Sequence, residues 1–292
     1  VGLMMWKFIE VVKPGGDNGT IKYYVGSWLL SPLILALSTR GSNDNLIAFF
    51  VFVSFYYLLK KQYVISGFFY GLAVHFKIYP IIYSIVLYFY IDCDQTLIEI
   101  GRRKQALFRR LFTRNRLVFT FVSASTFIGL TYYFYTVYGY EFLYEGYLYH
   151  FVRKDNRHNY SVYWYLIYHL YDEQASQLVS ILLFIPQWGL IVAAGILFYY
   201  DVFFAVFIQT MIFVAFNKVC TGQYFLWYVT LAPLVYANSD LKKRPFLSAF
   251  VLLVYALGQI PFGYYAYKFE FLGENTLMDI QKYNYVWFAC NI

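Results

Sequence analysis

The sequence predicts an all-α membrane protein that crosses the bilayer many times. Hydrophobic types make up 61% of its 292 residues and charged types only 13%, whereas an ordinary soluble domain carries about 25% charged residues. Long apolar stretches recur from end to end and show no polar stripe that could face water. A large soluble α-helical protein is therefore disfavoured, and a single integral membrane domain over residues 1–292 is the simplest organisation.

About nine to eleven apolar segments are expected to form a polytopic helical bundle. In chain order they fall near residues 1–12, 21–37, 46–59, 63–74, 79–90, 117–138, 178–200, 202–216, 222–236, 246–266 and 284–292. Crossing about 30 Å of hydrocarbon takes about 20 helical residues, and several of these segments are shorter. Short or re-entrant helices are therefore expected around residues 46–90, where they must be buried in protein or line a wet cavity.

Basic residues in short loops orient the chain, because such loops stay in the cytosol. Lys60-Lys61, the loop 91–116 and the loop 237–245 carry these residues. Counting passes outward from them predicts that the remaining polar stretches lie together on the opposite side. These stretches are residues 38–44, 75–77, 139–177, 217–223 and 267–283.

The loop 150–161 is the most polar stretch on that opposite side, with seven consecutive polar residues from Arg153 to Asn159. Cations are disfavoured there, so a compensating anion is expected. Its cationic side chains could cradle a phosphate or diphosphate, arginine offering a bidentate fork; they are Arg153, Lys154, Arg157 and His158. The alternative is a solvated loop whose charges meet lipid headgroups.

Two further polar turns contain ionisable residues beside membrane segments. His75 and Lys77 precede Pro80, which favours a helix break, and ionisable groups at membrane depth suggest a functional site. The alternative is a snorkelling lysine with a hydrogen-bonded histidine. Asp44 either pairs structurally with Arg40 or helps to hold a polar headgroup.

A last turn contains Asn217, Lys218 and Gln223, followed by aromatic residues suited to a sugar or to the membrane interface. Together these stretches predict a polar cavity with about five cations that opens on one membrane face. The cysteines Cys93 and Cys290, with the third at position 220, are scattered and predict neither a disulfide nor a metal site. No nucleic-acid partner is expected. Sequons occur at Asn18 and Asn159, and neither is expected to carry a glycan.

Four stretches resemble the family of GPI mannosyltransferase I catalytic subunits and appear in that family's order. They read STRGSND at 38–44, YGLAVHFKIYP at 70–80, RKDNRHNYS at 153–161 and FNKVCTGQYFLWY at 216–228. The resemblance covers nearly the whole chain. It implies a GT-C glycosyltransferase fold in the endoplasmic reticulum membrane, with a lumenal active site.

The resemblance also implies an inverting glycosyltransferase that uses dolichyl-phosphate mannose as donor. The acceptor would be glucosaminyl-(acyl)phosphatidylinositol, which receives the first mannose of the GPI anchor precursor in an α1,4 linkage. A small single-span stabilising subunit is the implied protein partner. The expected substrate- or phosphate-binding residues are Arg40, Asp44, His75, Lys77, Arg153, Lys154, Asp155, Arg157, His158, Asn159, Lys218 and Gln223.

The sequence departs from the family pattern in its acidic D-x-D motif, which the family carries in its first lumenal loop. The one D-x-D here, Asp92-Cys93-Asp94, borders the basic loop placed in the cytosol. The catalytic acidic pair is therefore expected before Val1. The chain is then expected to be a fragment that lacks the first helix and the first lumenal loop. A chain without this acidic pair could be inactive. A divalent metal would be compatible with D-x-D, but the sequence shows no ligand cluster for one.

Two other classes of protein remain as alternatives. A transporter or flippase for an anionic lipid-linked substrate would also use broken helices and buried cations, although it would often show two related halves, and no internal repeat is visible. A non-catalytic membrane scaffold is the third possibility.

Overall fold

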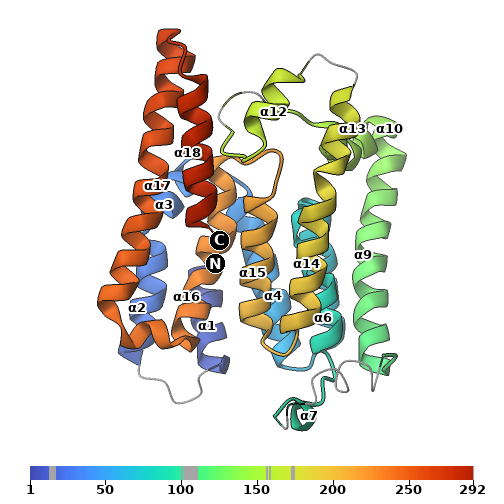
Figure 1. The fold of residues 1–292 in the computed structure, drawn as a ribbon. Helices are drawn as coiled ribbons and strands as arrows, with labels where there is room; N and C mark the ends of the chain where they lie inside the picture. Colours follow the sequence, from blue (N-terminus) through green and yellow to red (C-terminus); the bar gives the residue numbers. More distant parts are fainter. Residues whose placement is uncertain are drawn as a thin grey trace.

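The computed structural model describes residues 1–12, 18–99, 101, 111–155, 157, 159–171 and 175–291, and throughout these ranges the regular structure is helical. The helices run mostly along one direction and form a bundle with shorter elements at both ends (Figure 1). The predicted all-α class and the multiple apolar helices are thereby confirmed.

The described elements before residue 100 come first. They are α1 Gly2–Val12, α2 Asn18–Leu29, α3 Pro32–Thr39, α4 Asp44–Leu59, α5 Tyr63–Phe76, the 3₁₀ helix η1 Tyr79–Tyr83, α6 Ser84–Tyr90 and α7 Gln95–Glu99. After it come α9 Arg114–Tyr138, α10 Tyr140–Leu143, the π-helix η2 Tyr144–Leu148, α11 Tyr149–Val152 and α12 Trp164–His169. The chain continues through α13 Ala175–Leu182, α14 Phe184–Phe198, α15 Val202–Ala215, η3 Gly222–Tyr224, α16 Phe225–Asn238, η4 Asp240–Lys243, α17 Pro245–Leu272 and α18 Leu277–Cys290.

Among the described residues, three helices are long and apolar enough to cross a membrane: Arg114–Tyr138, Leu178–Phe198 and Pro245–Leu272. The predicted single segment 21–37 is instead a pair of helices whose axes bend by 53°. Pro32 explains the break, because it lacks an amide hydrogen and forces the residue before it into an extended conformation. The last helix also begins earlier than predicted, at Leu277.

The short helices predicted around residues 46–90 are confirmed as Asp44–Leu59, Tyr63–Phe76 and Tyr79–Tyr90, and they pack against one another and against α9. Ser54 of α4 and Ser66 of α5 exchange hydrogen bonds with each other's carbonyl oxygens at 3.0 and 2.8 Å. On the other face of α5, Gly67 and Gly71 lie directly against the backbone of α9. The inner faces of these short helices are therefore covered by protein, while one face of α5, with Val64 and Phe68, stays exposed.

The polar stretches predicted to share one side do meet at one end of the bundle, which carries α10, α12 and α13 at the top of Figure 1. Lys77 contacts Asp44, Asn159 bonds to the backbone of Lys218, and the side chain of Gln281 accepts a hydrogen bond from Tyr165 at 3.1 Å. The first contact joins the stretches 38–44 and 75–77, and the other two join 139–177 to 217–223 and to 267–283.

At the other end of the bundle, one of the basic residues is buried and hydrogen-bonded to the backbone. Arg116, which lies in the predicted basic loop 91–116, is 1% exposed. Its guanidinium donates to the carbonyl oxygens of Ile91 at 2.8 Å and Phe89 at 3.1 Å. Asp92 accepts hydrogen bonds from Thr113 and Asn115. The D-x-D at residues 92–94 thus closes a turn far from the other polar end.

Replacing Gly71 with alanine is expected to destabilise the protein by about 1–3 kcal/mol, because overpacking a helix contact displaces backbone. A Cβ at position 71 would overlap the carbonyl oxygen of Ser123 on α9. Gly129→Ala on α9 is the matched control, since a Cβ there meets nothing within 4 Å. Thermal unfolding of the detergent-solubilised protein measures both variants. Equal melting temperatures for Gly71→Ala and wild type would contradict the described α5–α9 contact.

Single cysteines at Arg40 and Arg157 are expected to react with a membrane-impermeant thiol reagent from the same side of sealed microsomes. A cysteine at Lys61 is expected to react from the opposite side. All three positions are exposed, and the native cysteines would first be replaced by serine. Labelling of positions 40 and 157 from different sides would contradict the shared end.

Candidate functional site

A cavity of about 330 Å³ lies at the end of the bundle where the polar stretches meet. Four of the predicted site residues line it: His75, Lys77, Arg153 and Lys218. Its apolar wall includes the rings of Phe142, Phe151, Phe184, Trp188, Tyr224 and Trp227. One cavity thus combines several cationic groups with an aromatic wall.

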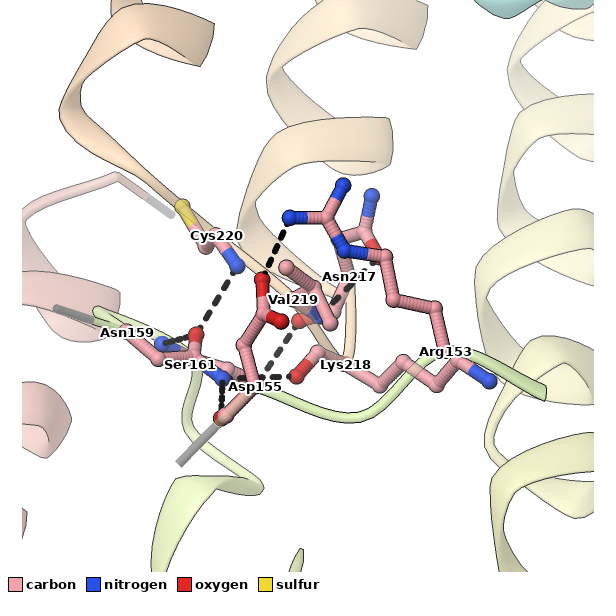
Figure 2. A network of polar contacts seen from close by, with 8 residues as sticks. All are labelled: Arg153, Asp155, Asn159, Ser161, Asn217, Lys218, Val219 and Cys220. Carbon is pink, nitrogen blue, oxygen red and sulfur yellow. Dashed lines mark hydrogen bonds and ion pairs between the residues drawn. The ribbon is translucent and has the colours of Figure 1, made fainter. Parts of the chain in front are cut away.

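Asn159 joins the two loops that carry the cationic groups (Figure 2). Its amide nitrogen donates to the carbonyl oxygens of Asp155 and Lys218, both at 3.0 Å. Its amide oxygen accepts from the backbone N–H groups of Ser161 at 3.0 Å and Cys220 at 2.8 Å. The side chain is 1% exposed and its bonds are all to backbone, so Asn159 fixes the loops instead of facing the cavity. Such burial also suits the prediction that it carries no glycan.

Arg153 enters the cavity just after α11 and is held by Asp155. Its Nη2 lies 2.6 Å from Oδ2 of Asp155. Burial is the largest single influence and opposes the charge of Arg153, but the bond to Asp155 and the charge interactions with Asp155, Tyr224 and Tyr149 together raise the pKa of the guanidinium. Asp155 was predicted to bind substrate, and here its carboxylate neutralises a cavity arginine.

Lys218 is the cavity cation with neutral partners. It is 3% exposed; its Nζ donates to the carbonyl oxygen of Phe151 at 2.6 Å and lies 4.8 Å from the ring centre of Phe184. Within the described ranges no carboxylate lies within ion-pairing distance of it. Burial, with a smaller repulsion from Lys154, lowers the pKa of Lys218 to about 8. An anion placed beside this ammonium would stabilise its charged form.

Lys77 follows α5 and projects into the cavity while bonded to Asp44. Nζ of Lys77 lies 2.5 Å from Oδ1 of Asp44, whose side chain is almost fully enclosed. The predicted structural pairing of Asp44 is thus made with Lys77 and not with Arg40, which is exposed on the turn after α3. The ammonium also lies 5.0 Å from the ring centre of Trp227, a favourable cation–π distance.

His75 is oriented by the neighbouring π-helix. Nδ1 of His75 lies 3.0 Å from the hydroxyl of Tyr147 in η2, and its ring stacks on Phe134 with centres 5.5 Å apart. The hydroxyl of Thr131 completes the group, 3.2 Å from Tyr147. Single π-turns within helices often occur at functional sites, and this one forms part of the cavity wall.

Several cavity residues escaped the sequence reasoning, Phe142 and Tyr147 among them. His150 also lines the cavity, and burial together with Arg153, Lys77 and Lys218 lowers the pKa of this imidazole, which favours its neutral form. Phe184 and Trp188 come from the start of α14 and are brought in by the fold. His150 opens the loop 150–161 and could have been included on that ground, whereas the apolar sequence of α14 gave no signal.

Other predicted residues lie beside the cavity and not in its lining. Arg157 is exposed, and Lys154 donates to the carbonyl oxygen of Tyr171 at 2.8 Å. Gln223 lies in η3, half-buried, next to the cavity residue Tyr224. His158 lies outside the described residues. Over the part of the chain that the structure describes, no three His, Cys, Asp or Glu side chains cluster as metal ligands would.

Comparison with known proteins identifies the family. The model of the mannosyltransferase (PIG-M) family matches residues 37–292. A GPI mannosyltransferase 1 of Dictyostelium discoideum is 38% identical, over 100% of this chain and 68% of its own length. The GPI alpha-1,4-mannosyltransferase I catalytic subunit of Danio rerio is 36% identical, over 99% of this chain and 69% of its own length.

A more distant relative, GPI mannosyltransferase 1 of Saccharomyces cerevisiae, is 34% identical over 85% of this chain and 61% of its own length. The chain spans about two thirds of the length of the Dictyostelium and Danio proteins. All the cavity-lining residues lie within the part that the family model matches. The chain therefore belongs to the PIG-M family of mannosyltransferases.

Proposed function

We propose that this chain transfers mannose from dolichyl-phosphate mannose to glucosaminyl-phosphatidylinositol, adding the first, α1,4-linked mannose of the GPI anchor precursor. The names of its relatives support this substrate pair. For this chain the proposal rests on one observation: the ammonium of Lys218 is buried in the cavity wall and has neutral partners. A buried cation without a counter-ion is costly, and a donor phosphate would supply that counter-ion.

The cavity matches the donor in shape as well as in charge. Lys218, Lys77 and Arg153 present N–H donors to a phosphate oxygen, while the rings of Phe151, Phe184 and Trp188 offer an apolar surface beside them. Phe151 and Trp188 are also partly exposed at the surface of the bundle. A lipid phosphate, with a charged head and an apolar tail, fits this combination better than a free sugar nucleotide, which has no apolar tail.

The reaction follows from the linkage chemistry. The acceptor hydroxyl oxygen attacks C1 of mannose as the bond from C1 to the phosphate oxygen breaks, and that oxygen keeps the electron pair. A β-linked donor then gives an α-mannoside through one inverting displacement with an oxocarbenium-like transition state. A carboxylate accepts the hydroxyl proton, a role we assign to the family's D-x-D motif. Phosphate leaves readily, so the cavity cations need only balance its charge.

We place the cavity on the lumenal side of the endoplasmic reticulum membrane, since the lysines and arginines of the opposite end favour the cytosol. A small single-span subunit is the proposed partner, and a divalent metal is compatible with the D-x-D motif. A flippase, the other class considered, would need the same anion site, but the family to which the chain belongs favours the transferase.

Lys218→Met is expected to lower kcat/KM for the donor about 100-fold, the usual effect of removing one well-placed electrostatic group. Mannose transfer from labelled dolichyl-phosphate mannose, measured in microsomes with the complete enzyme, tests this. Lys242→Met at the opposite end is the control, because Lys242 also donates to a backbone carbonyl oxygen but lies outside the cavity. If Lys218→Met had the wild-type kcat/KM at equal protein level, the proposal that Lys218 contacts the donor phosphate would be wrong.

The pH dependence supplies a second test. Because burial lowers the pKa of Lys218 to about 8, the ammonium loses its proton as the pH rises through that value, and kcat/KM should fall by up to about tenfold per pH unit above it. The donor is a phosphodiester and does not titrate in this range. Lys218→Arg, which stays charged, is expected to keep its kcat/KM constant from pH 7 to 9. The same alkaline decline in both proteins would contradict the assignment.

Asn159→Asp is expected to abolish most activity and to destabilise the fold. The carboxylate loses the two N–H groups that bond the carbonyl oxygens of Asp155 and Lys218, and each buried group left unsatisfied costs about 1–3 kcal/mol. Asn238→Asp, at an exposed position, is the matched control. Thermal unfolding and transfer assays measure both, and a wild-type melting temperature for Asn159→Asp would contradict the role given to this amide.

A further inference from the structure

Asp44 is a buried carboxylate that joins three separate segments. It is 1% exposed and begins α4. It accepts hydrogen bonds from Ser42 Oγ at 2.6 Å, Lys77 Nζ at 2.5 Å and Trp227 Nε1 at 2.9 Å. Lys77 and Trp227 line the cavity, whereas Asp44 itself does not. Its influence on a bound substrate must therefore pass through these two side chains.

The two side chains held by Asp44 form one rigid group. The indole of Trp227 is stacked between Tyr79, with ring centres 3.9 Å apart and planes 2° from parallel, and Tyr224, at 4.3 Å and 21°. Lys77 lies over this stack, 5.0 Å from Trp227 and 5.9 Å from Tyr224. Its side chain remains 24% exposed. Because Trp227 and Lys77 bond to the same carboxylate oxygen, Asp44 sets the position of the ammonium relative to the aromatic stack.

The pairing also decides how much charge the cavity presents. Lys77 is neutralised by Asp44 and Arg153 by Asp155, while Lys218 has no carboxylate partner among the described residues. The donor is a phosphodiester with one negative charge, but the product, dolichyl phosphate, is a monoester with about 1.5 to 2 negative charges near pH 7. A cavity with several unpaired cations would hold the product more tightly than the donor and would slow turnover.

We propose that Asp44 is a positioning residue of the transfer reaction. It fixes the Lys77 ammonium and the Trp227 indole in the cavity wall, and it cancels the charge of Lys77 so that the lysine directs N–H groups at the departing phosphate without retaining the product. This inference rests on the proposed function. It changes the role predicted for Asp44 from contact with a polar headgroup to action through its two partners.

The test compares Asp44→Asn, Lys77→Met and the double variant in the complete enzyme, with dolichyl-phosphate mannose as donor and dolichyl phosphate as added inhibitor. Asp44→Asn keeps the side-chain shape and frees the charge of Lys77. It is expected to lower kcat about tenfold, less than loss of a whole catalytic donor, and to lower the inhibition constant of dolichyl phosphate several-fold. A role limited to folding would not tighten product binding. Asp240→Asn, at an exposed pair with Lys243, is the control.

In the Lys77→Met background, Asp44→Asn is expected to leave the inhibition constant unchanged and to lower kcat only about threefold, the part of its effect that passes through Trp227, because the part that passes through Lys77 is already lost and the two substitutions are not additive. Full additivity, or a kcat and inhibition constant within twofold of wild type in Asp44→Asn, would overturn the proposal. If wild type itself transfers no mannose from this donor, the proposed function fails instead.

Should Asp44→Asn not accumulate, Trp227→Phe replaces it. This variant keeps a stacking ring and removes one of the three donors to Asp44. It is expected to lower kcat about threefold, because the indole loses its bond to the carboxylate, and to leave the inhibition constant unchanged, because the charge of Lys77 stays paired. A wild-type kcat in Trp227→Phe would overturn the proposal.

Discussion

The side-chain amide of Asn159 holds together the two loops on which the cavity depends. Neither loop is helical near this point, so the segment from Arg153 and the turn at Lys218 lack regular structure that could fix them. Four hydrogen bonds to backbone groups from one buried amide supply that order. Arg153 and Lys218 are 65 positions apart in the chain. The Asn159 contact brings their loops together so that both cations can face one phosphate.

The charges around the cavity follow one rule, namely that buried cations are paired unless a ligand can pair them. Removing one partner of a buried ion pair leaves an uncompensated charge, which costs several kcal/mol. Asp44 and Asp155 meet this requirement for Lys77 and Arg153. Among the described cations that line the cavity, Lys218 is the one bonded to neutral partners, and its lowered pKa reflects that cost. The exception marks the place where an anion contributes most.

The helices were predictable because the length and spacing of apolar runs report directly on the bilayer. The common end of the polar stretches was also predictable, since basic loops fix orientation. The sequence did not predict which individual side chains pair with each other. The sequence offered Arg40 as the neighbour of Asp44, but the fold supplies Lys77, and nothing local distinguishes a clamp such as Asn159 from a substrate contact. Trp188 lies in an apolar helix whose inward face only packing against other helices can define.

The most direct measurement is the structure of the complete enzyme with dolichyl phosphate bound, determined by cryo-electron microscopy. We expect phosphate density within about 3 Å of Lys218 Nζ, the usual hydrogen-bond distance, with the lipid tail along Phe184 and Trp188. Phosphate density elsewhere, with Lys218 still bonded to the carbonyl oxygen of Phe151 and the cavity filled by side chains or water, would contradict it.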